Sequence, residues 1–236
     1  MIRRVAVVIP AANEERRIGR CLAAVAAARR HLQSGRADIT IRTVVVLDGC
    51  HDGTAMIAAA SRDVQTVAVS AGSAGAARRA GVSAALAGAG RPSELWLANT
   101  DADSQVPASW LTEMVTEASR GAHLVLGTVL PGMTLDPLVR AQWLSRHHLR
   151  AGHPHVHGAN FGIRADAYLA LGGWPPVLTG EDAELARRAA RSGHLRIART
   201  ASIPVLTSVR HSGRAPRGFS DYLRDITVPA AEAVSG

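Results

Sequence analysis

Asp101 and Asp103, two aspartates one residue apart, are the strongest candidates for chemistry in this 236-residue chain. They follow a hydrophobic run at residues 95–98 that predicts a buried strand. Carboxylates at the end of such a strand can hold a hard divalent ion, Mn²⁺ or Mg²⁺. Such an ion would bridge the two phosphates of a nucleoside diphosphate and neutralise the leaving group. The alternative is an Asx-turn with the cap of a helix at Pro107, a common use of aspartate.

A second acidic pair, Glu181 and Asp182, opens a predicted helix directly after Gly180. Acids in a first turn complement the helix dipole, which is the structural explanation. The functional explanation is a general base, a carboxylate that removes the proton of an acceptor hydroxyl.

His211 lies in a polar segment at residues 209–214 and could be a third metal ligand, with neighbouring arginines holding phosphate. A lone loop histidine can also simply be solvated. Five further histidines could mimic a metal site, but their spacing does not fit a zinc motif on one helix face. We therefore expect most of them to be loop residues on the acceptor side: His147, His148, His153, His155 and His157.

The chain alternates β-rich runs with helical patterns, which predicts an α/β fold with a Rossmann-like, mostly parallel central sheet flanked by helices. Strands are expected at residues 4–9, 43–47, 64–69, 94–98, 123–127, 159–163 and near 195–198. Helices are expected at 13–32, 52–61, 76–86, 107–118, 135–149, 165–171 and 181–192, the first capped by Asn13. No linker divides the chain, so a single domain is expected. About 1–105 would form a nucleotide-sugar-binding half and about 106–236 an acceptor-binding half with a C-terminal tail.

Polar residues gather where the predicted strands end, and ligands bind at the carboxyl ends of the strands in an open parallel sheet. The residues at these ends are Pro10, Asn13 and Glu14 after the first strand, Asp48 and Gly49 after the second, and Asp101 and Asp103 after the fourth. Three acidic sites at one edge are harder to explain structurally than any one of them alone.

Composition narrows the classes of function. The net charge is +8 and every one of the 27 basic residues is arginine, but the arginines are scattered and aromatic residues make up only 3%. We therefore expect no nucleic-acid partner. Two cysteines, Cys21 and Cys50, give neither a disulfide framework nor zinc spacing. No apolar run approaches the ~20 residues of a membrane span, and residues 5–9 are too short for a signal peptide, so a cytoplasmic protein without an integral membrane segment is expected.

Five segments in this order resemble glycosyltransferase family 2, the inverting nucleotide-sugar transferases of the GT-A fold. They are residues 7–15 (VVIPAANEE), 46–54 (VLDGCHDGT), 75–81 (GAARRAG), 158–161 (GANF) with 172–174 (GGW), and 180–185 (GEDAEL). Leu47, Cys50 and Arg79 depart from the family pattern, which leaves the nucleoside contacts and the base preference open. The Q-x-x-R-W motif of processive synthases is absent, so a single transfer is expected.

The resemblance implies a function and a role for each matching residue. A UDP-sugar would give its sugar to a small or carrier-linked acceptor, with inversion and with Mn²⁺ or Mg²⁺ as cofactor. Asp101 and Asp103 would bind the metal, with His211 as a further candidate, and Asp182 beside Glu181 would be the catalytic base. The donor would contact Pro10, Ala11, Asn13, Glu14, Asp48, Gly49, Arg78, Asp101 and Ala102. A segment punctuated by Gly213, Pro216 and Gly218 is expected to act as a lid.

Two alternatives stay open at this point. A binding module that kept the fold without activity would have lost a metal carboxylate or the base, and all of these acids are present. A sugar-1-phosphate nucleotidyltransferase would resemble G-G-x-G-T-R near the N-terminus with lysines cradling phosphate, but this chain contains no lysine. The oligomeric state is not fixed by the sequence, and a homodimer is compatible with it.

Overall fold

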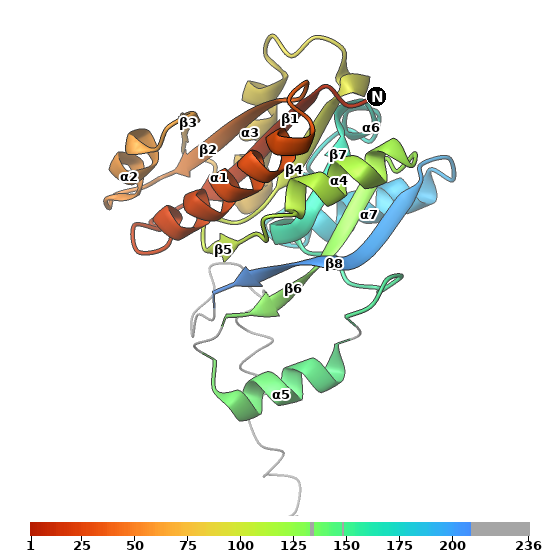
Figure 1. The fold of residues 1–236 in the computed structure, drawn as a ribbon. Coiled ribbons are helices and arrows are strands. Elements are labelled where there is room, and N and C mark those ends of the chain that lie inside the picture. The colour runs from red at the N-terminus through yellow and green to blue at the C-terminus, as the bar shows by residue number, and fades with distance from the viewer. Residues whose placement is uncertain (133–134, 148, 209–236) are drawn as a thin grey trace, which may run out of the picture.

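The computed structural model describes residues 1–132, 135–147 and 149–208, and one eight-stranded sheet runs through this part of the chain (Figure 1). The order of the strands is β3-β2-β1-β4-β7-β6-β8-β5. Their bounds are Arg4–Ala11 (β1), Thr40–Asp48 (β2), Val64–Val69 (β3), Leu95–Asn99 (β4), Ser104–Gln105 (β5), Leu124–Pro131 (β6), Phe161–Arg164 (β7) and Ile197–Thr207 (β8). The expected single α/β domain is confirmed in these residues.

Helices cover both faces of the sheet. Their bounds are Ile18–Gly35 (α1), Thr54–Ala60 (α2), Ala74–Leu86 (α3), Trp110–Ser119 (α4), Pro137–Arg146 (α5), Ala165–Ala170 (α6) and Glu181–Arg191 (α7), with short 3₁₀ helices at Pro92–Glu94 (η1) and Gly158–Asn160 (η2). One hydrophobic core lies between the sheet and α1, α2 and α4, and the other lies between the sheet and α3, α6 and α7. Alternate residues of β1 serve the two cores, with Val7 in the first and Val8 in the second.

The first half of the sheet is parallel, because β1 pairs with both β2 and β4 and β2 pairs with β3 in that sense. Its central strands are buried on both faces, as the continuous apolar runs in the sequence predict. The carboxyl ends of β1, β2 and β4 therefore meet at one edge.

The second half is mixed. Strand β7 is antiparallel to β4 and β6, whereas β6 and β8 are parallel, with a register shift between Gly127 and Val129. The strand expected near residues 195–198 is much longer than predicted, since β8 continues to Thr207 and pairs there with β5. A mostly parallel sheet flanked by helices is confirmed.

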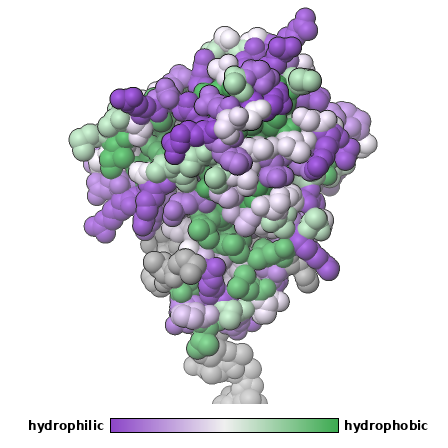
Figure 2. All heavy atoms as spheres, viewed as in Figure 1, coloured by the Kyte–Doolittle hydropathy of each residue, from purple (hydrophilic) through white to green (hydrophobic). Residues whose placement is uncertain are grey.

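Helix α5 stands apart from the sheet in Figure 1, held by a small separate cluster. Trp143 is its one fully buried residue, and Leu130, Leu135, Val139 and Leu149 pack around it. Leu138, on the same helix, is 81% exposed. Figure 2 shows hydrophobic side chains gathered in the lower part of this face, whereas hydrophilic side chains dominate its upper part.

Two local predictions are wrong. Asn13 does not cap the first helix, because α1 begins only at Ile18 and Asn13 has a left-handed backbone with φ of 53°. Its side-chain Oδ1 instead accepts a hydrogen bond of 2.7 Å from the backbone N–H of His51. Pro107 lies outside α4, and its carbonyl accepts a 3.0 Å hydrogen bond from the N–H of Trp110, where α4 starts.

In the described ranges, no helix is long and apolar enough to cross a membrane.

Candidate active site

The carboxyl ends of β1, β2 and β4 form the rim of the candidate site. Pro10 lies opposite Val46 in the β1–β2 register, and the N–H of Thr100, directly after β4, donates to the carbonyl of Val8 at 3.2 Å. The residues of these three strands that are expected to bind the nucleotide-sugar donor are thus neighbours in space. Parallel pairing explains this, since it aligns the ends of strands that are distant in sequence.

Asp48, at the end of β2, holds the loop that follows β3 through hydrogen bonds. Its Oδ1 accepts hydrogen bonds from the N–H groups of Ala71 at 2.6 Å and Gly72 at 3.2 Å. Gly49 has a positive φ of 57°, and its N–H donates to the carbonyl of Val69 at 2.9 Å. This carboxylate therefore shapes the rim as well as lying on it.

The turn after β1 is held by contacts to the segment after β2. The N–H of Glu14 donates to Oγ1 of Thr54 at 2.7 Å, and the side chain of Glu14 is buried. Cys50 donates its thiol to the carbonyl of Ala11 at 3.4 Å. Ala11 and Glu14, two residues that are expected to bind the nucleotide-sugar donor, are thus fixed against residues 49–54.

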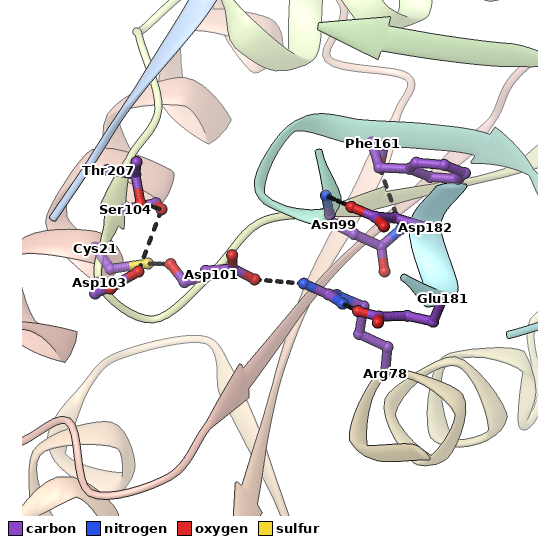
Figure 3. A network of polar contacts seen from close by, with 11 residues as sticks. Cys21, Arg78, Asn99, Asp101, Asp103, Ser104, Phe161, Glu181, Asp182 and Thr207 are labelled. Atoms are coloured by element: carbon purple, nitrogen blue, oxygen red, sulfur yellow. Dashed lines mark hydrogen bonds and ion pairs between the residues drawn. The ribbon is translucent and has the colours of Figure 1, made fainter. Parts of the chain in front are cut away.

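Arg78 of α3 lies at the centre of the polar network in Figure 3, where it joins two carboxylates from opposite halves of the chain. Its Nη2 donates to Oδ1 of Asp101 at 2.6 Å, and its Nη1 donates to Oε1 of Glu181. The side chain is only 3% exposed, and its guanidinium carbon lies 5.4 Å from the ring centroid of Trp174. Arg78 thus links the end of β4 to the start of α7.

Two glycines make room for this bridge. A Cβ at Gly158 would lie 2.4 Å from Nη2 of Arg78, and a Cβ at Gly75 would lie 3.0 Å from Cβ of Glu181. Both glycines lie in segments that resemble family motifs. Glycine is required at these positions because Arg78 and Glu181 approach the backbone closely, and not because the backbone has a positive φ.

Charge and burial oppose one another at this bridge. Burial alone would lower the pKa of Arg78, but Asp101 and Glu181 raise it above its usual range. Burial raises the pKa of Asp101; Arg78 lowers it and Asp103 raises it, leaving it above its usual range. The side chain of Asp101 is nevertheless 35% exposed, so its carboxylate borders solvent. Asp101 and Asp103 therefore repel one another.

Asp103 lies beside β5 and the end of β8 (Figure 3). It accepts hydrogen bonds from the hydroxyls of Ser104 and Ser208, and Ser104 also contacts Oγ1 of Thr207 at 3.0 Å. Ala102, between the two aspartates, is buried in the core. Neither aspartate caps α4, whose first residue is preceded by Ser109 with no side-chain cap, so the helix-cap alternative is not supported.

Cys21 supports the same loop from α1. Its buried thiol donates to the backbone carbonyl of Asp101 at 3.3 Å. Burial raises its pKa, and the charges of Asp103 and Asp101 raise it further, so it stays a neutral thiol.

Asp182 lies in the first turn of α7, beside Glu181 but in a different environment. Its Oδ2 accepts a 2.7 Å hydrogen bond from the N–H of Gly158, and its Oδ1 accepts one of 2.7 Å from the N–H of Ala183. Glu181 is instead buried against Arg78. Of the two expected catalytic acids, Asp182 is thus held by backbone N–H groups and Glu181 by the guanidinium of Arg78.

Asn160 is a residue of this site that the sequence analysis missed. It is fully buried; its Nδ2 donates to the carbonyls of Thr128 at 2.9 Å and Ile203 at 2.7 Å, and its Oδ1 accepts from Nε1 of Trp110 at 2.9 Å. These contacts fix η2, and with it the Gly158 N–H that holds Asp182. A signal was present, because Asn160 lies in the GANF motif, but the motif alone does not reveal a role.

The histidine-rich loop forms a row of rings that ends near Asp182. His147 stacks on Trp143 with centroids 3.8 Å apart, and the ring of His155 lies 5.1 Å from His147 and 5.6 Å from His153. His157 follows at 6.0 Å from His155. Burial lowers the pKa of His157 to about 4, although Asp182 acts to raise it. The expected loop position of these residues is confirmed for those that the structure describes.

No group of three or more histidine, cysteine or acidic side chains in the described residues is arranged to hold a metal ion. The row of histidines is therefore not a preformed metal site. Asp101 and Asp103 remain the candidate carboxylates, while His211 and the expected lid lie outside the described residues.

Comparisons with solved structures reveal the same architecture. TarS of S. aureus has a TM-score of 0.60 at 14% identity, covering 88% of this chain and 37% of TarS. A glucosyl-3-phosphoglycerate synthase of M. tuberculosis has a TM-score of 0.56 at 20% identity, covering 95% of this chain and 76% of that protein. The same synthase solved with Mn²⁺, UDP and glucosyl-3-phosphoglycerate gives 0.56 at 19% identity, with 95% and 76% coverage. A comparison with curated proteins gave no match.

The parallel half-sheet of this chain, continued by a mixed half, is thus the GT-A fold that it shares with these solved structures. The chain belongs to glycosyltransferase family 2, whose profile matches residues 6–168. The chain spans 37% of the length of TarS, so likeness to that protein concerns the fold of one part of it.

Proposed function

We propose that this glycosyltransferase moves a sugar from a UDP-sugar to a hydroxyl of an acceptor, with inversion and with a divalent cation. The observation that carries the proposal is the Arg78 bridge, which places the Asp101 carboxylate of the donor rim and the first turn of α7 on opposite sides of one buried guanidinium. Donor and base would thereby be held in a fixed relation. The synthase of M. tuberculosis solved with Mn²⁺ and UDP supports this choice of nucleotide and metal.

The donor set fits a hard divalent cation. Asp101 and Asp103 offer carboxylate oxygens, and their mutual repulsion, which contributes to the raised pKa of Asp101, would be relieved by a cation between them. Asp101 and Asp103 would hold the ion. When bound, the cation would neutralise charge that develops on the leaving diphosphate.

Asp182 is the residue that we assign as general base. Its Oδ2 is anchored by the Gly158 N–H, so the carboxylate is oriented before the acceptor arrives. The acceptor oxygen would form its bond to the anomeric carbon as the bond from that carbon to the diphosphate oxygen breaks. The hydroxyl proton passes to Asp182, and the nucleoside diphosphate leaves with the bonding electron pair.

Glu181 would serve differently. Its pairing with Arg78 keeps the guanidinium between the two halves, so we assign it a positioning role at the site. Pro10, Ala11, Asn13 and Asp48, with Glu14 and Gly49, would line the nucleoside end of the donor, as the resemblance implies. Membership of family 2 favours a glycosyltransferase over a nucleotidyltransferase. A cytoplasmic location and a homodimer stay predictions.

The test is a thermal-shift panel of UDP, GDP, TDP and CDP, each with and without Mn²⁺. UDP with Mn²⁺ at ~100 times its dissociation constant should stabilise the protein by roughly 2.7 kcal/mol, or several degrees. Asp103→Asn should abolish the metal-dependent part of the shift, whereas Glu117→Gln on α4 should leave it intact. Equal shifts with and without Mn²⁺ in the wild type would remove the metal from the proposal, and no shift with any nucleotide would remove the donor site.

A further inference from the structure

Strand β3 leaves one edge of the sheet open. Within the part of the chain that the structure describes, it lies at the end of the strand order and pairs with β2 alone (Figure 1). The carbonyl of Val69 accepts a hydrogen bond from the N–H of Gly49, directly after β2, so the backbone groups of Val69 point towards β2. Because successive residues of a strand alternate in this respect, the N–H and C=O groups of Val64, Thr66 and Ala68 point to the open edge.

This edge lacks the features by which proteins commonly protect an open strand. Those features are charged side chains, proline, bulges and a covering element. The sequence of β3, VQTVAV, contains neither a charged residue nor a proline, and its register with β2 runs without a shift. Gln65, Thr66 and Ala68 are exposed. The edge is therefore available for pairing with another strand.

Helix α2 extends the uncharged surface beside this edge. It packs against β3, and its exposed residues are alanines and Met56, which is 73% exposed. Residues 53–77 contain only two charged residues, Arg62 and Asp63, although 19% of the chain is charged. An exposed surface with so little charge is typical of an interaction site.

Asp63 limits the edge at the amino end of β3. Its backbone is left-handed, with a φ of 60°, so the extended strand begins only at Val64. Arg29 of α1 lies 3.4 Å from its carboxylate and donates to its backbone carbonyl at 3.3 Å. The charge of Asp63 thus already has a partner, and pairing at this edge is restricted to β3 itself.

We infer that β3 pairs antiparallel with β3 of a second copy of this chain, so that the protein forms a two-fold dimer through this edge. With the axis at Thr66, this residue lies opposite its own copy, and Val64 lies opposite Ala68 of the second copy. Each residue that points to the edge then exchanges its backbone hydrogen bonds with the residue opposite. Arg62 lies opposite Ser70 of the second copy, so no like charges face one another.

The other end of the sheet explains why assembly stops at two copies. Strand β5, at that end, consists of Ser104 and Gln105 alone, so it offers no comparable edge to β3 of a further copy. A two-fold contact uses the same edge of both copies and is therefore closed. The contact is small, because a strand of six residues is only about 20 Å long. A standard interface covers about 800 Å² per partner, so we expect a weaker dimer that dissociates on dilution.

Analytical ultracentrifugation from about 1 µM to about 300 µM protein, the range of a weak interface, tests the inference. At the highest concentrations the wild type should approach twice the 24.7 kDa mass of the chain. Because Thr66 lies on the axis, Thr66→Glu and Thr66→Arg each place two like charges opposite one another, and each should weaken dimerisation at least tenfold. An equimolar mixture of the two variants should dimerise at least as tightly as the wild type, since opposite charges then face one another.

The matched control is Thr40→Glu, which adds the same charge at an exposed threonine at the start of β2 and should dimerise like the wild type. Circular dichroism checks that each variant is folded. A wild type that stays monomeric over the whole range overturns the inference, and so does a dimer that Thr66→Glu weakens no more than Thr40→Glu. If the mixture of Thr66→Glu and Thr66→Arg stays monomeric, the axis does not lie at Thr66 and the inference is overturned as well. None of these outcomes depends on the proposed function.

Discussion

Two regions of the molecule handle charge in opposite ways. One is the proposed donor rim, at the ends of β1, β2 and β4, and the other is the proposed acceptor side, which carries the histidines of residues 153–157. At the rim, the single guanidinium of Arg78 pairs with two carboxylates, those of Asp101 and Glu181, so acids outnumber cations there before any ligand binds. On the acceptor side, Arg199 contacts only backbone carbonyls among the described residues, those of His153 and His155. The first arrangement has more acids than cations, whereas in the second the described residues give the cation no acidic partner. The two sides meet at Asp182, and this is where changes should be most informative.

The largest effect is expected for Asp182→Asn. The amide keeps an oxygen that can accept from the Gly158 N–H, so the loop should stay in place while the base is lost. Turnover, measured as release of nucleoside diphosphate in the presence of acceptor, should fall by about 10²–10⁴-fold. Affinity for UDP with Mn²⁺ should be almost unchanged.

Glu184→Gln is the matched control, because Glu184 lies in the same first turn of α7 but pairs with Arg187 and Arg188. Its turnover should stay near that of the wild type. Wild-type turnover in Asp182→Asn would take the base away from Asp182 and move the search to another group at the junction of the two sides.

Arg78→Met should have the next largest effect, on stability. It leaves Glu181 buried and Asp101 half-exposed without their common cation, and breaking such a buried pair costs about 3–5 kcal/mol of unfolding free energy. Urea unfolding at pH 7 measures this. Arg79→Met, one residue on and exposed, should change stability by less than about 0.5 kcal/mol.

The double variant Arg78→Met, Glu181→Gln sharpens the reasoning, because it removes one of the stranded charges. It should recover part of the lost stability. If Arg78→Met alone is as stable as the wild type, this guanidinium does not stabilise the carboxylates of the rim, and the contrast with the acceptor side fails.

The sequence predicted the donor rim better than the acceptor side for a physical reason. Alternating strands and helices impose parallel pairing, and parallel pairing alone brings the ends of β1, β2 and β4 together. The placement of Asp48 and Asp101 at one edge therefore follows from local patterns. The prediction that Asn13 caps a helix is wrong because a polar residue before a helical pattern is typical both of a helix cap and of the left-handed turn that Asn13 adopts.

The link between the two sides and the loop around Asn160 depend instead on contacts between distant residues. Arg78 and Glu181 are 103 positions apart, and Asn160 reaches β6, β8 and α4 through side-chain hydrogen bonds. Neither periodicity nor composition encodes such pairings. The extension of β8 to Thr207 is similar, because its second half is defined by its neighbours β6 and β5 rather than by its own residues. His211 and the expected lid stay predictions.

Asn160→Ala probes how firmly the acceptor loop is fixed. It would leave the buried Nε1 of Trp110 without its acceptor and would remove donors from two strand carbonyls. An unsatisfied buried group costs about 1–3 kcal/mol, so a loss of roughly 2–4 kcal/mol of unfolding free energy is expected for the three hydrogen bonds together. Urea unfolding gives the value.

The matched control is Asn13→Ala, which also removes a side-chain hydrogen bond to backbone but in an exposed turn of the donor rim. It should cost less than Asn160→Ala. If Asn13→Ala loses more unfolding free energy than Asn160→Ala, the turn at Asn13, and not the loop at Asn160, is the one that depends on its side-chain hydrogen bonds.

The smallest effect is expected from pH acting on His157. Its pKa falls from an ordinary 6.5 to about 4 in the folded state, mainly through burial, so the unfolded chain binds more protons between these values. The stability that His157 contributes is thus present above pH 6.5 and is lost as the pH falls from 6.5 towards 4. Allowing for its partial exposure to solvent, the loss attributable to this ring should be about 1–3 kcal/mol.

His157→Gln should flatten that part of the stability curve, measured by urea unfolding at several pH values between 4 and 7. His194→Gln, an exposed histidine outside the row, should leave the slope unchanged. If the slope in His157→Gln equals that of the wild type, burial of this ring does not contribute to the pH dependence of stability.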